Sequence, residues 1–389
     1  MAHRMPTLVT AAPKSSMTPA QTSTNQSRDK SKSPRFHGLD AARAIAIIGM
    51  LAVNVGPRKE TGETDVAVLL YDIPHGRASL LFMILAGIGL SLMTRRARTT
   101  GAPLPWQTIL WRALLLIASG LALQLLGHDI SVILTYYGVL FLCALPLLRA
   151  PTWLLLALAG ASLVAGPVIW LALQQLSGVT FAFLAPSLTD PIFTAMHAVF
   201  LTGAYPVLIW LAPFLLGLVL GRCRLGYRIF QNRLIAVGTL ATVIPLAISG
   251  VLTLVTGPPT SAYGWDQLAS AEAHSQMPLW MISGCGSAVL IIGLLLRSEA
   301  WVTQRLSWLI SAGRLSLTIY VAHLFVLAWV VRPGPDTLLQ GFVVSTLMSV
   351  AFVALAHLWW HRLGTGPLER LLSWPPKLTT TTRARSTQR

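Results

Sequence analysis

The segment YDIPHGRASLLF (71–82) places three chemically active side chains just ahead of a long apolar run. Pro74 favours the first turn of a helix, so His75 is predicted to lie at a helix N-terminus. There the helix dipole disfavours an imidazolium, and a neutral imidazole can act as a general base near pH 7. Asp72 could orient the ring, and Arg77 could anchor a substrate. Alternatively, His75 contacts only water or lipid headgroups.

Asn54 is a further candidate, because it lies at the far end of the apolar segment 39–56. A buried amide must find hydrogen-bond partners. It could bond to a neighbouring helix, or it could point a donor into a site. The predicted catalytic residues are therefore His75, Asn54 and Asp72.

Other histidines fall toward the same side of the predicted spans. Taken singly, each is better explained by structure than by catalysis, whereas several histidines at one membrane depth favour a site. Together with Arg77, the candidates for substrate binding are His128, His274, His323 and Tyr320.

Charged residues also occur within the predicted spans, toward the ends opposite to those that carry Asn54 and His75. Asp40 and Arg43 are three residues apart on one predicted helix, so they can form an ion pair. Arg112 and Arg314 can extend to the membrane interface, or bind an anionic cofactor, because arginine suits phosphate. Asp40, Arg43, Arg112 and Arg314 are therefore the candidate contacts to a cofactor.

The composition is that of an integral membrane protein. Of the 389 residues, 54% are hydrophobic and only 11% are charged, against about 25% charged in soluble domains. The net charge of +16 is spread over short clusters between apolar segments. This pattern argues against nucleic-acid binding. The three cysteines form no C-x-x-C pair, so no metal site is predicted.

Apolar segments long enough to cross a bilayer recur along the chain, which predicts an all-α, polytopic transmembrane bundle. Lysine and arginine concentrate in alternate loops and in both tails, so both termini are predicted to be cytoplasmic. About ten spans are expected, at 39–56, 76–94, 107–126, 130–148, 151–173, 204–221, 234–256, 278–296, 308–331 and 338–360.

The ends of the chain differ from this apolar region. Residues 1–38 and 374–389 are rich in polar and basic residues and are predicted to be disordered cytoplasmic tails around a membrane domain, 39–373. The segment 174–203 contains neither lysine nor arginine. It is apolar enough to lie in the interface or to re-enter the bundle.

The first two segments, RFHGLDAARAIAIIGMLAVNVGP (35–57) and HGRASLLFMILAGIGLSLM (75–93), resemble the catalytic domain of heparan-alpha-glucosaminide N-acetyltransferase and its bacterial relatives. The family pattern is matched at Arg35, Asp40, Arg43 and Asn54. Further stretches similar to the bacterial branch of this transmembrane acyltransferase superfamily are 202–222, 274–275, 313–323 and 366–372.

The resemblance implies an acyltransferase of the cell membrane, expected to be bacterial. An acyl group, with acetyl as the first expectation, would pass from cytoplasmic acyl-CoA to an extracytoplasmic sugar or glycolipid. An Asn and a His form the catalytic pair of the animal enzyme. Asn54 matches the Asn, and His75 corresponds to the His by its place in the loop-to-helix region, not by spacing. A covalent acyl-histidine stays open.

Other functions remain compatible with the sequence. Intramembrane Arg and His could line the pathway of a transporter or flippase for a polar or lipid-linked substrate. Paired axial histidines could hold a haem, and a subunit without chemistry is a third alternative. Membrane lipids are expected partners, and a homodimer is compatible with the sequence.

Overall fold

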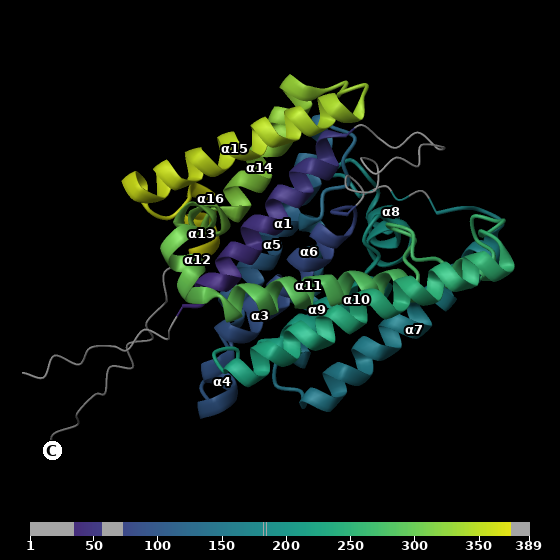
Figure 1. Ribbon diagram of the computed structural model, residues 1–389, viewed down its shortest axis with the longest axis horizontal. Coiled ribbons are helices and arrows are strands. Elements are labelled where there is room, and N and C mark those ends of the chain that lie inside the picture. The colour runs from purple at the N-terminus through teal and green to yellow at the C-terminus, as the bar shows by residue number, and fades with distance from the viewer. Residues whose placement is uncertain (1–34, 57–72, 182, 184, 375–389) are drawn as a thin grey trace, which may run out of the picture. The chain divides into compact units, whose positions relative to one another are not determined.

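The computed structural model describes residues 35–56, 73–181, 183 and 185–374 (Figure 1). This part of the chain consists of helices and connecting segments, with no strand, so the predicted all-α membrane fold is confirmed. The α-helices are α1 (His37–Val55), α3 (Arg77–Met93), α4 (Arg95–Thr100), α5 (Trp106–Leu123), α6 (Leu134–Ala144), α7 (Thr152–Ser177), α8 (Ile192–His197), α9 (Val207–Leu220), α10 (Arg228–Thr256), α11 (Pro278–Arg297), α12 (Glu299–Arg305), α13 (Ser307–Arg314), α14 (Ser316–Val326), α15 (Leu338–Leu363) and α16 (Pro367–Ser373). Short 3₁₀ or π turns are η1 (Gln124–Leu126), η2 (Leu145–Leu147), η3 (Ala198–Thr202), η4 (Trp265–Ala269) and η5 (Leu327–Val331).

Helix length and composition mark the membrane-spanning elements of the described residues. Six helices are long and apolar enough to cross a membrane: α1, α5 with η1, α7, α10, α11 and α15. Two bent pairs reach that length together, α8–η3 with α9 at 62° and α13 with α14–η5 at 78°. Two shorter apolar helices, α3 and α6 with η2, complete the set. Each predicted segment falls on one of these elements, whereas the count of ten spans and the orientation stay predictions.

α1 is the central helix of the bundle. It packs against α3, α11, α13 and α15, and Figure 1 shows α15 alongside it, with α10 lying along α11. Gly313 on α13 permits the closest of these approaches, because a Cβ there would overlap the backbone carbonyl of Asp40. α1 itself carries Asp40, Arg43 and Asn54, and it also contacts α14, which carries Tyr320 and His323.

The start of α1 differs from the predicted boundary. The helix begins at His37, two residues inside the expected 1–38 tail, because the carboxylate of Glu299 accepts a hydrogen bond of 2.6 Å from the His37 backbone N–H. Apart from the first residues before this helix and Trp374 at the other end, the two tails lie outside the described residues. Their predicted disorder stays a prediction.

The predicted span 308–331 is a sharply bent pair of helices, not one straight helix. α14 starts anew at Ser316, and the Glu369 carboxylate on α16 accepts hydrogen bonds from the backbone N–H groups of Leu317 at 2.8 Å and Thr318 at 3.0 Å. A carboxylate at a helix N-terminus satisfies free donors and complements the dipole. Glu369 thus fixes the start of the helix that carries His323.

The segment 174–203 also gains helical structure. α7 extends to Ser177, and α8 with η3 then leads into α9 through the 62° bend. Such a bent pair is either a broken span or a re-entrant segment. Re-entry into the bundle was one of the two expectations for this stretch.

Candidate active site

Asn54 and His75 line one cavity of about 510 Å³ at the C-terminal end of α1. This volume lies in the range of small-molecule sites, about 300–1,000 Å³. Two of the three predicted catalytic residues therefore line the same cavity, and the third, Asp72, lies outside the described residues. We call this space the Asn54 cavity; its other polar lining residues include Asp129, Ser131, Gln174, Tyr205, Gln267, Glu272, His274 and Ser275.

A buried histidine holds the side chain of Asn54. The Asn54 Nδ2 and His323 Nε2 atoms are 3.1 Å apart, and His323 is fully buried on α14. With Nδ2 as the donor, Nε2 accepts and the ring proton resides on Nδ1. Nδ1 has no hydrogen-bond partner among the described residues. His323 therefore lies behind Asn54 and fixes its amide, which keeps a second N–H available for a ligand.

Arg332 fixes the end of α1 from the loop after η5. Its guanidinium donates to the backbone carbonyl oxygens of Asn54 at 3.0 Å, Val55 at 3.4 Å and His128 at 2.9 Å. Terminal carbonyls of a helix lack intrahelical partners, and a cation there complements the dipole. Arg332 thus joins the backbone of Asn54 to the loop that precedes α6.

His128 has a structural role in this geometry. Its Nε2–H donates to the carbonyl of Leu123 at 3.0 Å, and its Nδ1 accepts from the backbone N–H of Ile130 at 3.1 Å. Both ring nitrogens are used and burial lowers the pKa of His128, so the ring is neutral. Tyr320 similarly supports the fold: its hydroxyl accepts from the Ile133 N–H at 3.2 Å, and its ring packs 5.0 Å from that of His323.

His274 lies in the loop before α11 and does line the Asn54 cavity. Its ring packs between those of Tyr205 and Trp280, with centroids at 6.1 Å and 5.6 Å. Burial, with a smaller effect from His75, lowers the pKa of His274 to about 4. The imidazole of His274, which lines the cavity with His75, is thus neutral at physiological pH.

Sequence reasoning missed Gln174 and Glu272 among the lining residues, whereas Asp129 stands out in the sequence beside His128, in the loop after the third predicted span. Gln174 accepts a 2.8 Å hydrogen bond from the Phe181 N–H through Oε1, while its buried Nε2 lacks a partner among the described residues. The pair Gln174–Gln175 at the end of an apolar run was the signal that could have indicated it. The two carboxylates lie in loops whose spatial convergence no local pattern encodes.

The predicted cofactor residues at the other end of α1 contact one another. The Asp40 carboxylate is 2.7 Å from Arg43 and 3.5 Å from Arg314, and Trp360 stacks 4.4 Å from the Arg314 guanidinium. The ion pair expected for Asp40 and Arg43 is therefore present. Along the helix, Asp40 and Asn54 are about 21 Å apart.

Arg112 and Arg77 lie apart from these two groups. Arg112 donates to the Leu372 carbonyl at 3.1 Å and contacts the Met93 sulfur. Arg77 donates to the carbonyl and hydroxyl of Ser283 on α11, at 3.2 Å and 3.0 Å. Arg77 is thus directed toward α11, and it is not among the described residues that line the Asn54 cavity.

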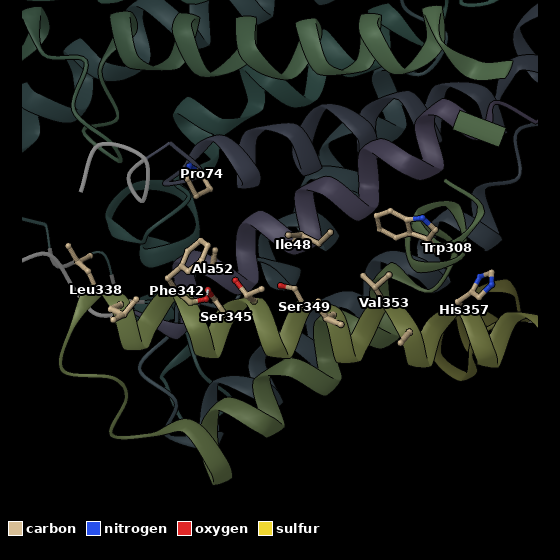
Figure 2. A pocket seen from close by; sticks show the side chains of 14 residues that line it. Ile48, Ala52, Pro74, Trp308, Leu338, Phe342, Ser345, Ser349, Val353 and His357 are labelled. Carbon is tan, nitrogen blue, oxygen red and sulfur yellow. Dashed lines mark hydrogen bonds between the residues drawn. The ribbon is translucent and has the colours of Figure 1, made fainter. Parts of the chain in front are cut away.

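An apolar groove of about 1140 Å³ runs between α1 and α15 (Figure 2). Figure 2 shows Leu338, Phe342, Ser345, Ser349, Val353 and His357 of α15 facing Ile48 and Ala52 of α1, with Pro74 and Trp308 beside them. From Leu338 to His357 the groove follows α15 for about 28 Å, close to the ~30 Å of a hydrocarbon core. Ala52 and Pro74, which line the groove, are the chain neighbours of Val53 and His75, which line the Asn54 cavity.

Comparison with known proteins adds one finding. A model of an acyltransferase domain, that of the acyltransferase 3 family, matches residues 36–358, most of the chain. No curated protein matches the chain significantly.

Proposed function

Because the chain belongs to the acyltransferase 3 family, and is thus a membrane acyltransferase, we propose that it transfers an acyl group from acyl-CoA to an acceptor bound in the Asn54 cavity. The observation that carries this proposal is the shared cavity of Asn54 and His75, with the amide of Asn54 held by His323. Acetyl-CoA is the first donor to test, because the resemblance to heparan-alpha-glucosaminide N-acetyltransferase implies acetyl transfer.

In the proposed reaction, His75 removes a proton from an amine or hydroxyl of the acceptor. The acceptor attacks the thioester carbonyl carbon, and the Asn54 amide donates a hydrogen bond to the resulting oxyanion, a role worth about 3 kcal/mol in other enzymes. Collapse of this intermediate breaks the C–S bond. The CoA thiolate then takes the proton from the His75 imidazolium, so that the ester or amide product and CoA leave a neutral imidazole.

The charge of the cavity favours an acceptor with an amino group. Asp129 and Glu272 line it, and no lysine or arginine is among the described lining residues. An ammonium group would be attracted by these carboxylates. It would first lose one proton to water, and the neutral amine would then give its second proton to His75 as it attacks the thioester. The Gln174 amide, whose Nε2 has no hydrogen-bond partner among the described residues, adds a donor for a hydroxyl or carbonyl of the acceptor.

The groove between α1 and α15 supports a lipid-linked acceptor within the predicted class of sugars and glycolipids. An apolar groove of bilayer length accommodates a hydrocarbon chain, and each buried CH₂ contributes about 0.8 kcal/mol. A chain in this groove would bring the attached head group to the Asn54 cavity. At the other end of α1, Arg43 and Arg314 remain candidate contacts for the donor's phosphates, as does Arg112 on α5.

CoA release from acetyl-CoA by the purified chain in nanodiscs tests the proposal, with amino sugars supplied free or linked to a polyprenyl lipid. We expect acceptor-dependent release, reduced at least ~100-fold in His75→Ala and in Asn54→Ala. His361→Gln, an exposed histidine at the end of α15, is the matched control and should retain full activity. Lipid-linked substrate movement without CoA release would instead support the flippase alternative.

Two substitutions on α15 test whether the acceptor carries a lipid chain. Ser349→Trp fills the groove, whereas Leu355→Trp places the same ring on an exposed position of the helix outside it. We expect Ser349→Trp to raise KM for the lipid-linked acceptor and to leave the rate with a free amino sugar unchanged. Equal effects of the two variants would argue against a chain in the groove while leaving acyl transfer intact.

A further inference from the structure

A second polar cavity, of about 850 Å³, lies away from the Asn54 cavity, at the end of α3. It is formed by α4, the start of α7 and the turn between α9 and α10. We call it the arginine cavity, because five arginines line it and no aspartate or glutamate is among its described lining residues. These are Arg95, Arg98, Arg149, Arg222 and Arg224.

Arg222 is held in the wall of this cavity without a neutralising partner. Its Nη1 donates to the Ala150 carbonyl at 2.6 Å, and its Nη2 donates to the Leu148 carbonyl at 3.2 Å. Its buried Nε–H has no hydrogen-bond partner among the described residues. Carbonyl oxygens fix the guanidinium plane but leave its positive charge uncompensated. A buried cationic donor in that state is costly unless a ligand pairs with it.

Arg98 is fixed in a similar way from α4. Its Nη1 donates to the Thr94 hydroxyl at 2.7 Å and its Nη2 to the Ser91 hydroxyl at 3.1 Å. Burial, followed by the nearby charges of Arg222 and Arg95, lowers the pKa of Arg98. Two guanidinium groups thus repel each other across the cavity, and neither forms an ion pair with a carboxylate of the described residues.

Membrane orientation alone does not explain this arrangement. Basic residues that only set topology act from the solvated loop surface, as the exposed Arg96 on the same helix can. Arg98 and Arg222 are instead partly buried and pre-positioned by neutral hydrogen-bond acceptors. The geometry is that of an anion site built before its ligand arrives.

We infer that the arginine cavity binds a phosphate-bearing ligand with at least two negative charges. Arginine forks pair with phosphate oxygens through parallel hydrogen bonds, which suits two fixed guanidinium groups facing one space. The Thr99, Thr152 and Tyr227 side chains in the lining add further polar groups. The phosphate can belong to a soluble polyphosphate compound or to the head group of a membrane lipid, and the experiment separates these sources.

The test uses the full chain in nanodiscs. In discs of phosphatidylcholine alone, pyrophosphate binding is measured by titration calorimetry. In discs containing phosphatidylglycerol, lipid retained after detergent extraction is measured by native mass spectrometry. The variants are Arg98→Gln and Arg222→Gln, and Arg96→Gln is the control because Arg96 is an exposed neighbour outside the cavity.

We expect either pyrophosphate affinity or phosphatidylglycerol retention to fall at least 10-fold in both cavity variants and less than 2-fold in Arg96→Gln. A loss confined to pyrophosphate assigns a soluble ligand, and a loss confined to the lipid assigns a head group. If Arg222→Gln does not fold, Arg98→Gln and Arg224→Gln decide the outcome. Binding that is absent from the wild-type chain, or equal in all variants, overturns the inference.

Discussion

Replacement of Asp40 by asparagine should destabilise the contact between α1 and α13. Asp40 is 2% exposed and lies between Arg43, 28% exposed, and Arg314, 16% exposed. Removal of one partner from a buried pair costs about 3–5 kcal/mol, because a charge is left uncompensated. Arg314 can move less toward water than Arg43, so we expect a loss of about 3 kcal/mol, mainly through Arg314.

Double-mutant cycles with Arg314→Gln and Arg43→Gln separate the two pairs. Unfolding in sodium dodecyl sulfate, followed by tryptophan fluorescence, leaves most transmembrane helices helical. The Asp40–Arg43 pair, three residues apart on α1, then survives in the unfolded state and contributes little. The Asp40–Arg314 pair links two helices and is lost, so its coupling energy should be about 1–3 kcal/mol.

The opposite pattern would refute this reasoning. A coupling energy below ~0.5 kcal/mol between Asp40 and Arg314 would mean that the charge contact does not stabilise the bundle. If Asp40→Asn also left unfolding unchanged but weakened acyl-CoA binding, the residue would belong to the donor site. That result would favour the cofactor prediction over the structural ion pair.

Substitutions of three residues, Glu369, His323 and His274, test how the surrounding structure holds the candidate site in place. Glu369→Ala removes an acceptor for two backbone N–H groups, so we expect a loss of about 2 kcal/mol in the same unfolding assay, with Glu369→Gln intermediate. His323→Ala should lower kcat of acyl transfer with little change in KM, and His323→Gln should recover part of it; equal defects in both variants would contradict a positioning role through Asn54. The pKa of His274, lowered to about 4, makes the unfolded state bind more protons between that value and the unperturbed ~6.5, so stability should fall as pH drops through this window. His274→Gln should flatten that part of the pH–stability profile, and an unchanged slope would argue against a buried neutral ring.

The sequence predicts the helical segments well because long apolar runs have few alternatives in a bilayer. It also predicts the Asp40–Arg43 pair, since a spacing of three residues on a helix brings the two side chains together. The break in the 308–331 segment, by contrast, could not be predicted from the sequence. GRLSLTIYVAH contains no proline that would mark a helix break at Leu315, and the carboxylate that starts α14 comes from Glu369, more than fifty residues away.

The candidate site is less accessible to sequence reasoning for the same reason. Asn54 and His75 can both be predicted as candidates, because polar groups at the ends of apolar segments are conspicuous. The contact between Asn54 and His323 joins residues 269 positions apart, and no local pattern specifies which histidine lies behind the amide. The arginine cavity could not be predicted either. Its arginines belong to basic clusters that the sequence explains by membrane orientation, and only the fold shows that these clusters line one cavity.

The shortness of α6 bears on how the helices of the bundle share their contact with lipid. α6 with η2 spans Leu134–Leu147, 14 residues, and α6 is mostly buried among other helices, so the bilayer need not adapt to its length. Its axis is about 21 Å long, against ~30 Å of hydrocarbon in an unperturbed bilayer. Because protein rather than lipid surrounds most of α6, its shortness does not expose it to hydrophobic mismatch, and the longer neighbouring helices are left to match the hydrocarbon thickness.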